Sequence, residues 1–478
     1  MNARDERGGG HVDLLVIGGG ITGSAVARDA AARGLSVTLV ERTDLAAGTS
    51  SRSTKLLHGG LRYLEHGQLR LVREALRERE ITARLAPAWA RPLPFCVPVR
   101  PGVFPGRIAA RIGVGVYDLL AGGHGLRRGR FVRSEEVYRL APALAPGWTG
   151  GVAFMDRQTD DVRLTVAIAR DAKRWGATMH LGVDVVGVER EGGAFHVACQ
   201  DEDGTASSFR ARCVVNAGGP WADGVRRLVG GARPILRASR GAHLVIEGLA
   251  LRAALLLPGG APGHRVFAIP WRGVALFGTT DVADARDPGR DLPEIEDLKL
   301  LFQTACRLFP SARLTRRAVL SSFTGVRPLL EDGGDTLSSS REHRVFDEDG
   351  FVTIAGGKLT TWRTMAQATV DAVVSRLGRG GPSPRALLEG TLPGGDVERP
   401  DLEVVLAQEM VRHADDIVFR RLPLGHDPRE TRRQLPAIVA RAGSVLGWDA
   451  ARRETESSRV VARLEADAAR LDEALGPR

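Results

Sequence analysis

Residues 12–41 read VDLLVIGGGITGSAVARDAAARGLSVTLVE, and this stretch decides the fold. Its first six residues, VDLLVI, are apolar except for Asp13, which is typical of a strand buried in a parallel sheet. Residues 24–33 place alanine and valine at helical spacing before Gly34, and residues 36–40 form a second apolar strand. The stretch therefore predicts a β-α-β unit of the Rossmann type.

A glycine-rich turn joins the first strand to the helix. Gly18, Gly20 and Gly23 satisfy the pattern GxGxxG. The first glycine permits the tight turn, the second lets a pyrophosphate approach the backbone, and the third allows close packing of helix on strand. Glu41, at the end of the second strand, could accept hydrogen bonds from ribose hydroxyls and would repel a 2′-phosphate, which disfavours NADP. The pattern predicts a dinucleotide site, and a plain glycine turn is the alternative.

The rest of the chain favours FAD as the dinucleotide. Long insertions interrupt the sheet, which resumes at residues 351–355. Further glycine turns follow apolar strands at 216–219 and 355–357, and the second opens a helix whose N-terminus could stabilise the charge of a reduced flavin. Only one GxGxxG unit with a following acid is found, so NAD(P)H is not expected as the electron partner. A quinone, dioxygen or a carrier protein remains as the acceptor.

The pattern along the chain predicts an α/β protein with a Rossmann-type FAD-binding domain, an inserted antiparallel substrate domain and a short helical C-terminal domain. The FAD-binding domain is expected to comprise residues 1–90, 151–232 and 346–380. The substrate domain is expected to comprise a cap region at 91–150 and residues 233–345. A Gly/Pro-rich linker at 381–400 and the helical domain at 401–478 follow.

The local periodicity of apolar residues predicts further helices and strands. Residues 69–85 predict an amphipathic helix, and 162–175 and 293–309 two further helices. Strands near 178–190, 194–200 and 207–215 are expected to form a small antiparallel meander.

The composition narrows the possible classes of protein. There is no signal-peptide pattern and no apolar run of about 18 residues, so we expect a cytoplasmic protein without a transmembrane helix. The net charge is +10, but only four of the 67 basic residues are lysines, which indicates a compositional bias toward arginine. No basic run is interleaved with aromatic residues, so nucleic-acid binding is not expected. The cysteines lack metal-ligand spacing and are expected to be buried free thiols in a reducing compartment: Cys96, Cys199, Cys213 and Cys306.

Several motifs, taken together, resemble the FAD-dependent glycerol-3-phosphate dehydrogenases, the membrane-associated, quinone-reducing type. The most specific is TSSRSTKLLHGGLRYLEHGQLRLVREALRERE at 49–80. The other motifs are VVNAGGPWAD (214–223), IPW (269–271), GTTDV (278–282), FTGVRPL (323–329) and AGGKLTTWR (355–363). They occur in family order over about residues 11–395, and HADDIVFRR at 413–421 is a weaker match to the family's helical domain.

The resemblance implies a set of cofactor-binding residues. FAD is expected to be bound without a covalent link, because a histidine that attaches FAD often precedes a glycine pair by several residues, whereas His58 is directly next to Gly59. The implied residues are Gly18, Gly20, Ile21, Thr22, Gly23, Glu41, Arg42, Thr49, Ser50, Ser51, Lys55, His58, Gly60, Leu61, Ala217, Gly218, Gly357, Lys358, Leu359 and Thr360.

The resemblance also implies oxidation of glycerol 3-phosphate to dihydroxyacetone phosphate, by hydride transfer to flavin N5. A phosphate dianion needs at least two cationic partners. The implied substrate-binding residues are Arg62, Tyr63, Thr279, Arg327, Arg341 and Lys358. The scarcity of lysine independently supports the last of these. The expected catalytic residues are His243, Arg327 and Lys358, with His243 as the base and His58 or Arg327 as the alternative base.

Other functions remain open. An oxidase that uses dioxygen, an amino-acid or amine oxidase on the same scaffold, and a flavin-binding protein without turnover would share many of these motifs. Residues 104–130 mix apolar and basic side chains and could form an interfacial helix at the inner face of the membrane. Only about 18 residues separate Gly395 from Ala414, fewer than in the family, which weakens the expectation of a homodimer and of membrane attachment.

Overall fold

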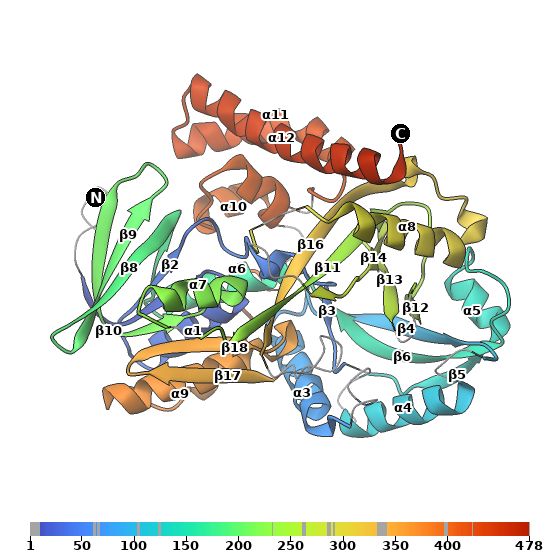
Figure 1. Ribbon diagram of the computed structural model, residues 1–478, viewed down its shortest axis with the longest axis horizontal. Coiled ribbons are helices and arrows are strands. Elements are labelled where there is room, and N and C mark those ends of the chain that lie inside the picture. Colours follow the sequence, from blue (N-terminus) through green and yellow to red (C-terminus); the bar gives the residue numbers. More distant parts are fainter. Residues whose placement is uncertain are drawn as a thin grey trace.

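Two sheets lie next to each other and helices cover them both (Figure 1). The predicted fold class, a Rossmann-type domain with an antiparallel sheet and C-terminal helices, is confirmed. The computed structural model describes residues 10–477 except 61–63, 65–66, 103–105, 123–125, 232, 261–263, 284–287, 290–291, 332–341, 396–399 and 423.

The first sheet has the strand order β17-β18-β10-β1-β2-β7. Its strands are β1 (His11–Ile17), β2 (Val37–Glu41), β7 (Thr178–Leu181), β10 (Ala206–Asn216), β17 (His343–Glu348) and β18 (Phe351–Gly356). All but β17 run in parallel, so their carboxyl ends meet at one edge. The helices packed on one face are α1 (Ile21–Ala32), α6 (Asp161–Arg174) and α9 (Trp362–Leu377). Apolar side chains of alternate strand positions fill the space between sheet and helices.

The other face of the first sheet carries β8 (Val183–Glu191), β9 (Ala194–Asp201) and the short helix α7 (Ala222–Arg227). The prediction of one strand near 178–190 is wrong. Gly182 has a φ of +69°, and its N–H donates to the Thr43 carbonyl at 3.0 Å, so the chain turns there. Strand β7 therefore pairs in parallel with β2, and only β8, β9 and β10 form the antiparallel meander.

The second sheet has the strand order β15-β11-β14-β13-β12-β4-β6-β3, with β16 on β11 and β5 on β6. Its strands are β3 (Leu56–Leu57), β4 (Arg91–Val99), β5 (Arg130–Arg133), β6 (Gly150–Gln158), β11 (Leu236–Ile246), β12 (Ala254–Pro258), β13 (Arg265–Trp271), β14 (Val274–Gly278), β15 (Val282–Ala283) and β16 (Val319–Leu330). All pairs are antiparallel except the short contact of β4 with β12. The predicted boundary at residue 151 is wrong, because the ladder from Gly150 to Gln158 joins β6 to this sheet rather than to the FAD-binding segment.

Each face of the second sheet has its own core, because successive side chains of a strand point to opposite sides. Leu244 and Phe277 pack toward α8 (Ile295–Leu308), whereas their neighbours Val245 and Leu276 pack on the other side. That other side is covered by α3 (Leu69–Leu85) and α4 (Arg107–Leu120), and a further short helix is α5 (Ser134–Leu140). The helix predicted over 69–85 is confirmed.

The C-terminal segment is helical throughout its described part. It comprises α10 (Leu402–Gln408), a π-helix (Asp416–Arg421), α11 (Pro428–Leu446) and α12 (Ala450–Leu475). The helices α11 and α12 lie side by side along the upper edge in Figure 1, and the end of α12 packs on α8 through Leu471. The stretch predicted as a linker is packed rather than free. Leu387 is buried, Leu392 is buried in the core of the first sheet, and the Leu392 N–H donates to the Leu85 carbonyl at 2.7 Å.

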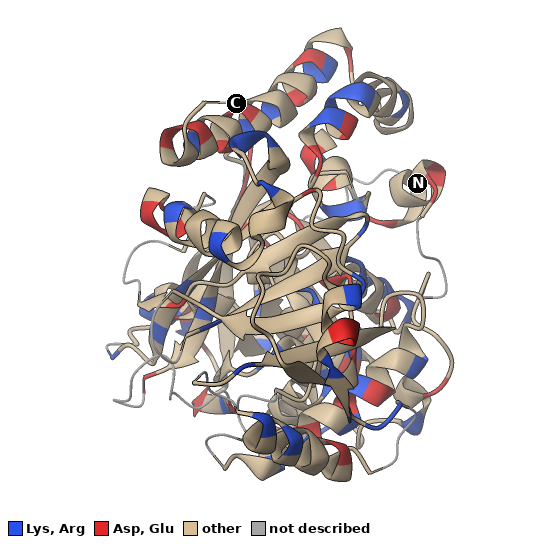
Figure 2. Cartoon of the chain, turned by 90° about the vertical axis from the view of Figure 1, so that its right-hand side faces the viewer, with Lys and Arg blue, Asp and Glu red and all other residues tan. Residues whose placement is uncertain are grey.

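The surface charge, the cysteines and the length of the helices can also be compared with the sequence predictions. Acidic and basic residues alternate along the helices in the view of Figure 2. All four cysteines are free, as predicted, but Cys306 is only partly buried because it lies on the outer side of α8. None of the helices within the described ranges is long and apolar enough to cross a membrane.

The contact of α1 with the turn before it leaves no room for a side chain at Gly23. A Cβ atom there would lie 1.9 Å from the Gly18 carbonyl oxygen. We expect Gly23→Ala to lower the free energy of unfolding by about 2–3 kcal/mol, because the helix must move off the turn. Gly113→Ala in α4 is the matched control, since its Cβ position has no neighbour within 4 Å and alanine favours a helix by up to about 1 kcal/mol. Urea unfolding measures both, and a Gly23→Ala protein as stable as the wild type would contradict this account.

Candidate functional site

A cavity of about 440 Å³ lies at the carboxyl edge of the first sheet. It follows the ends of β1, β2, β10 and β18, which is where doubly wound sheets bind their ligands. Most of the predicted cofactor residues line it: Gly18, Gly20, Ile21, Thr22, Glu41, Arg42, Thr49, Ser50, Ala217, Gly218, Gly357, Lys358 and Leu359.

The helix α1 begins at the floor of this cavity. Its N-cap residue Gly20 provides no side chain, and the Ile21 N–H donates to the Ser50 hydroxyl at 2.9 Å. Glu41 ties β2 to the same turn, because its carboxylate accepts the Gly19 N–H at 2.6 Å and the Thr43 N–H at 2.9 Å. Burial raises the pKa of Glu41 in spite of these hydrogen bonds. The open helix terminus and the acid beside it match the pyrophosphate and ribose of a dinucleotide.

The remaining predicted cofactor residues that the structure describes do not line this cavity. Thr360 exchanges hydrogen bonds of 3.3 Å with the backbone of His58, so it joins the loop after β3 to the start of α9. Gly60 is buried in the same loop, and Leu61 lies outside the described residues. The ammonium group of Lys55 pairs with the Asp161 carboxylate at 2.6 Å.

A second cavity of about 610 Å³ lies between the second sheet and the C-terminal helices. Ser51 and Lys55, both predicted to hold the cofactor, line this cavity instead. Arg52 lines both cavities, so the loop after η1 (Thr49–Ser51) forms part of the wall between them.

Arg327 on β16 is the best-anchored of the predicted substrate residues. Its Nη2 donates to the Thr279 hydroxyl at 2.9 Å, and its Nη1 lies 3.4 Å from the Asp281 carboxylate. Gly241 on β11 leaves room for this group, since a Cβ there would lie 2.3 Å from both Arg327 Nη2 and Thr279 Oγ1. All these contacts use Arg327 as a donor, which supports a role as a fixed cation rather than as a base. Thr280 instead accepts the Ala242 N–H at 2.9 Å and is structural.

His243, the predicted base, lies on β11 two residues after Gly241. Its Nε2 is 3.1 Å from the Thr54 hydroxyl, and its ring stacks on Phe323 with centroids 4.7 Å apart. Burial, together with the nearby charges of Arg327 and Lys55, lowers its pKa to about 3. The imidazole is therefore neutral at ordinary pH and can accept a proton, and an anionic ligand beside it would raise that pKa. The alternative base His58 presents its ring edge-on to Phe267.

Lys358 follows β18 and lines the first cavity next to Gly357. It caps the short turn of residues 359–361, where its carbonyl accepts the Thr361 N–H at 3.1 Å. The predicted residues Arg62, Tyr63 and Arg341 lie outside the described residues.

Several lining residues escaped the sequence analysis. Trp221 closes one side, and the Arg42 guanidinium lies 4.4 Å from its ring centroid. Its place in VVNAGGPWAD could have drawn attention to it. Other lining residues come from β8, the β9–β10 turn and the C-terminal helices: Val183, Asp184, Val185, Glu202, His413, Asp415, Asp416, Arg420, Arg459 and Arg463. Four of them, His413, Asp415, Asp416 and Arg420, belong to the motif HADDIVFRR, whereas no local motif marks the others.

Known proteins resemble this chain along most of its length. Residues 13–371 match the family described as FAD dependent oxidoreductase (DAO). D-erythritol 1-phosphate dehydrogenase of Brucella abortus (strain 2308) is 38% identical over 82% of this chain and 79% of its own length. Mitochondrial glycerol-3-phosphate dehydrogenase of Homo sapiens is 37% identical over 83% of this chain but only 57% of its own length. The chain thus spans little more than half of these mitochondrial relatives.

A solved structure of a glycerol-3-phosphate dehydrogenase resembles this chain in fold, as the relatives do in sequence. The glycerol-3-phosphate dehydrogenase from Bacillus halodurans, complexed with FAD, superposes with a TM-score of 0.77 and 27% identity over 99% of this chain and 97% of that one. The fold and the cavity define a dinucleotide-binding enzyme of the flavin type. The chain belongs to the family of FAD-dependent oxidoreductases, which confirms the resemblance seen in the motifs, and it is related to the glycerol-3-phosphate and D-erythritol 1-phosphate dehydrogenases.

The lowered pKa of His243 can be measured directly. In protein with ¹³C-labelled histidine, we expect its imidazole signal, assigned by its loss in His243→Gln, to stay in the neutral form down to about pH 5. An imidazole with the ordinary pKa near 6.5 would be largely protonated there, whereas burial lowers the pKa of His243 to about 3. Saturation with inorganic phosphate should raise the midpoint, since an anion near Arg327 offsets its charge. A midpoint at or above the ordinary value in the free protein would contradict the assigned environment.

Proposed function

We propose that the chain oxidises the secondary hydroxyl of sn-glycerol 3-phosphate to give dihydroxyacetone phosphate, and that the electrons pass to a quinone. FAD, bound without a covalent link, supplies the acceptor for the hydride. The observation that carries the proposal is the position of the Arg327 guanidinium over Gly241, two residues along β11 from the neutral imidazole of His243. A phosphate-binding cation and a proton acceptor thus share one surface of the second sheet.

The phosphate would be held by Arg327 and Lys358. Arg327 is already oriented by Thr279, and its planar group can bind a phosphate through two hydrogen bonds. Pro328, the next residue, lines the same cavity as Lys358, so β16 and the end of β18 both border the cofactor cavity. Two cations from different strands suit a dianion better than the single arginine that a carboxylate would need. This difference favours a polyol phosphate over an amino acid.

His243 would take the proton of the substrate hydroxyl. Its Nδ1 is buried and has no hydrogen-bond partner among the described residues, while Nε2 contacts Thr54. With Thr54 oriented toward Nε2, the second nitrogen can serve the substrate. The adjacent Phe323 keeps water from one face of the ring.

D-erythritol 1-phosphate is the second candidate substrate. The Brucella abortus relative that bears its name matches over 79% of its own length, more than the mitochondrial relatives do. Both compounds carry a phosphate and a neighbouring secondary hydroxyl, so the residues above would serve either.

Attachment to a membrane surface would bring the enzyme to its quinone. On α4, Ile108, Ile112 and Leu119 are 76%, 61% and 79% exposed and lie on one helical face, with exposed Arg107 and Arg111 beside them. Sedimentation of the chain with anionic lipid vesicles tests this contact.

Anaerobic titration of the purified holoprotein tests the proposed function. We expect glycerol 3-phosphate to bleach the flavin absorbance and a soluble quinone analogue to restore it. D-erythritol 1-phosphate and a panel of amino acids are the competing substrates, and the ratio of kcat/KM ranks them. Bleaching by amino acids alone would overturn the proposal, and rapid reoxidation by dioxygen with stoichiometric peroxide would instead identify an oxidase.

Substitutions separate phosphate binding from proton transfer. We expect Lys358→Ala to raise the KM for glycerol 3-phosphate by about 10-fold to 100-fold, because one charge-assisted contact is lost. His243→Gln should instead lower kcat by about 100-fold or more, the usual contribution of a general base. Steady-state kinetics at saturating FAD measures both. An unchanged KM in Lys358→Ala, or loss of FAD from it, would contradict its assigned role.

A further inference from the structure

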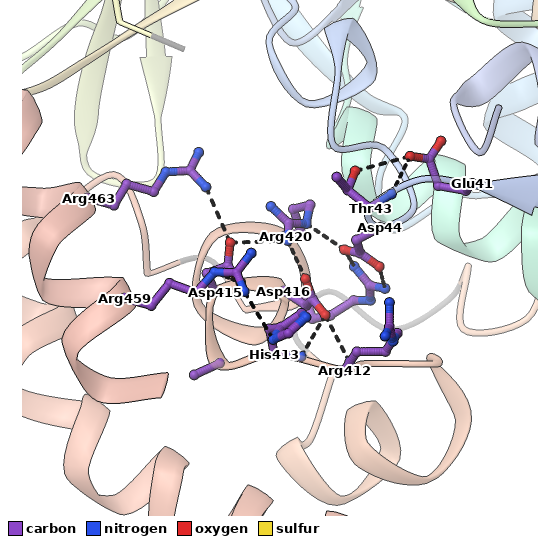
Figure 3. Close-up of polar contacts among 12 residues, drawn as sticks. Glu41, Thr43, Asp44, Arg412, His413, Asp415, Asp416, Arg420, Arg459 and Arg463 are labelled. Carbon is purple, nitrogen blue, oxygen red and sulfur yellow. Dashed lines mark hydrogen bonds and ion pairs between the residues drawn. The ribbon is translucent and has the colours of Figure 1, made fainter. Parts of the chain in front are cut away.

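The C-terminal helices reach the cofactor cavity, although they lie beyond residues 13–371, the stretch that matches the FAD-dependent oxidoreductases. The family match ends at residue 371, whereas His413, Asp415 and Arg459 line the same cavity as Gly18 and Glu41. Figure 3 shows these C-terminal side chains gathered opposite Glu41 and Thr43. The cavity is therefore bounded by two structural units rather than by one.

A buried ion-pair cluster fixes the C-terminal helices to the strand end that bears Glu41. Asp44, three residues after Glu41, accepts hydrogen bonds from Arg421 at 2.7 and 2.8 Å and from Arg420 at 2.5 Å. The Asp44 carboxylate and the guanidinium groups of Arg420 and Arg421 are almost fully buried, and the Arg421 side chain has no exposed surface. Buried charges persist only when they are paired, so the helical domain and this loop must stay together.

A second connection spans the outer end of the cavity. His413 Nε2 lies 2.9 Å from Glu202, which sits in the turn between β9 and β10, and Nδ1 lies 2.9 Å from Glu456 on α12. Arg412 adds an ion pair of 3.4 Å to the same Glu202. We call the contact of Glu202 with Arg412 and His413 the clasp. It joins the first sheet to the C-terminal helices across the lining residues of the cavity.

The charges around His413 favour its protonated form. Burial lowers its pKa, but the hydrogen bond to Glu456 and the charge of Asp416 outweigh burial and the repulsion by Arg459, so the pKa is raised above its ordinary value. The other groups that face the ring are Glu202, Arg412 and Arg452. A protonated ring can donate from Nε2 to Glu202, as the clasp requires, and from Nδ1 to Glu456 at the same time.

Two arginines of α12 border the cavity one helical turn apart. Arg459 and Arg463 lie 3.7 and 3.8 Å from the Asp415 carboxylate, and their side chains are 49% and 38% exposed (Figure 3). Arg459 also lies 3.2 Å from His413 Nδ1, and the Arg463 guanidinium lies 4.1 Å from the Phe419 ring centroid. Each guanidinium group carries five N–H donors and these ion pairs are long and exposed, so both groups can contact an anion in the cavity as well. The anion expected there is the pyrophosphate at the N-terminus of α1.

We propose that the helical C-terminal domain is part of the FAD site: it closes the cavity over the adenosine diphosphate half of the cofactor, with the clasp holding it in place and Arg459 and Arg463 supplying positive charge. The proposal rests on FAD as the occupant of the cavity, which is part of the proposed function. It does not depend on which substrate or acceptor the enzyme uses.

Reconstitution of the full-length apoprotein with FAD tests the proposal. We expect the Arg459→Gln/Arg463→Gln double variant to bind FAD at least tenfold more weakly than the wild type, with flavin fluorescence as the readout. The matched control is Arg432→Gln/Arg441→Gln on α11, whose side chains are 47% and 49% exposed and pair with Glu465 and Glu403 away from the cavity lining. Equal FAD affinity in both double variants would overturn the role of the arginines.

A pH profile of FAD release provides the second measurement, which a merely destabilised domain would not reproduce. A histidine whose pKa is raised in the folded state stabilises the clasp below its ordinary pKa, and this contribution is lost as pH rises through the raised value. FAD dissociation from the wild type should therefore accelerate with rising pH across that value, whereas His413→Gln should release FAD rapidly at every pH. A pH profile unchanged by His413→Gln would overturn the clasp. A wild type that binds FAD but is not reduced by glycerol 3-phosphate would instead sink the proposed function alone.

Discussion

The close approach of α1 to the turn after β1 is the constraint on which the rest of the structure depends. The Gly18 carbonyl occupies the position that any side chain at Gly23 would need. The helix can therefore begin directly at the carboxyl edge of the first sheet, with its N-terminal residues lining the cavity. Glu41 binds the N–H of Gly19 and so attaches the end of β2 to the same turn. The N-terminus of α1 and the Glu41 carboxylate are thus fixed relative to each other by this turn.

The residues proposed for proton transfer and phosphate binding depend on a different constraint, which is the register of the second sheet. Ser239, Gly241 and His243 alternate along β11 and so point to the same face. Arg327 pairs with Ser239 across the β11–β16 ladder, and its side chain turns along the strand to lie over Gly241. The missing side chain at Gly241 thus has a chemical consequence. Burial lowers the pKa of the His243 imidazole, and the close approach of the Arg327 cation lowers it further. A shift of one residue in this register would place the base and the cation on opposite faces.

Much of this arrangement could be predicted from local sequence. The GxGxxG turn, the amphipathic helix at residues 69–85 and the fold class follow from periodicity and glycine placement, which act over one or two elements. The errors concern partners distant in sequence. Strand β7 pairs with β2, and β6 joins the second sheet, because of ladders between segments that carry no mutual signal. The same holds for Asp44 and Arg421, which are 377 residues apart. A lone aspartate in a loop gives no sign that it will be buried against an arginine pair.

The contact between Asp44 and Arg421 is ionic and buried, and this affects how the helical domain is held at the cavity. An apolar patch between the domains would tolerate small rotations, whereas the bidentate pairing of Arg421 with Asp44 fixes both the plane and the direction of approach. Separation of the domains would expose the pair to water, but a partial shift would leave a charge buried and unpaired, which costs several kcal/mol. The helical domain is therefore held in one position or released entirely. Asp44 follows Glu41 by three residues. The loop after β2 therefore sets both the position of the helical domain, through Asp44, and the position of the Glu41 carboxylate at the cavity.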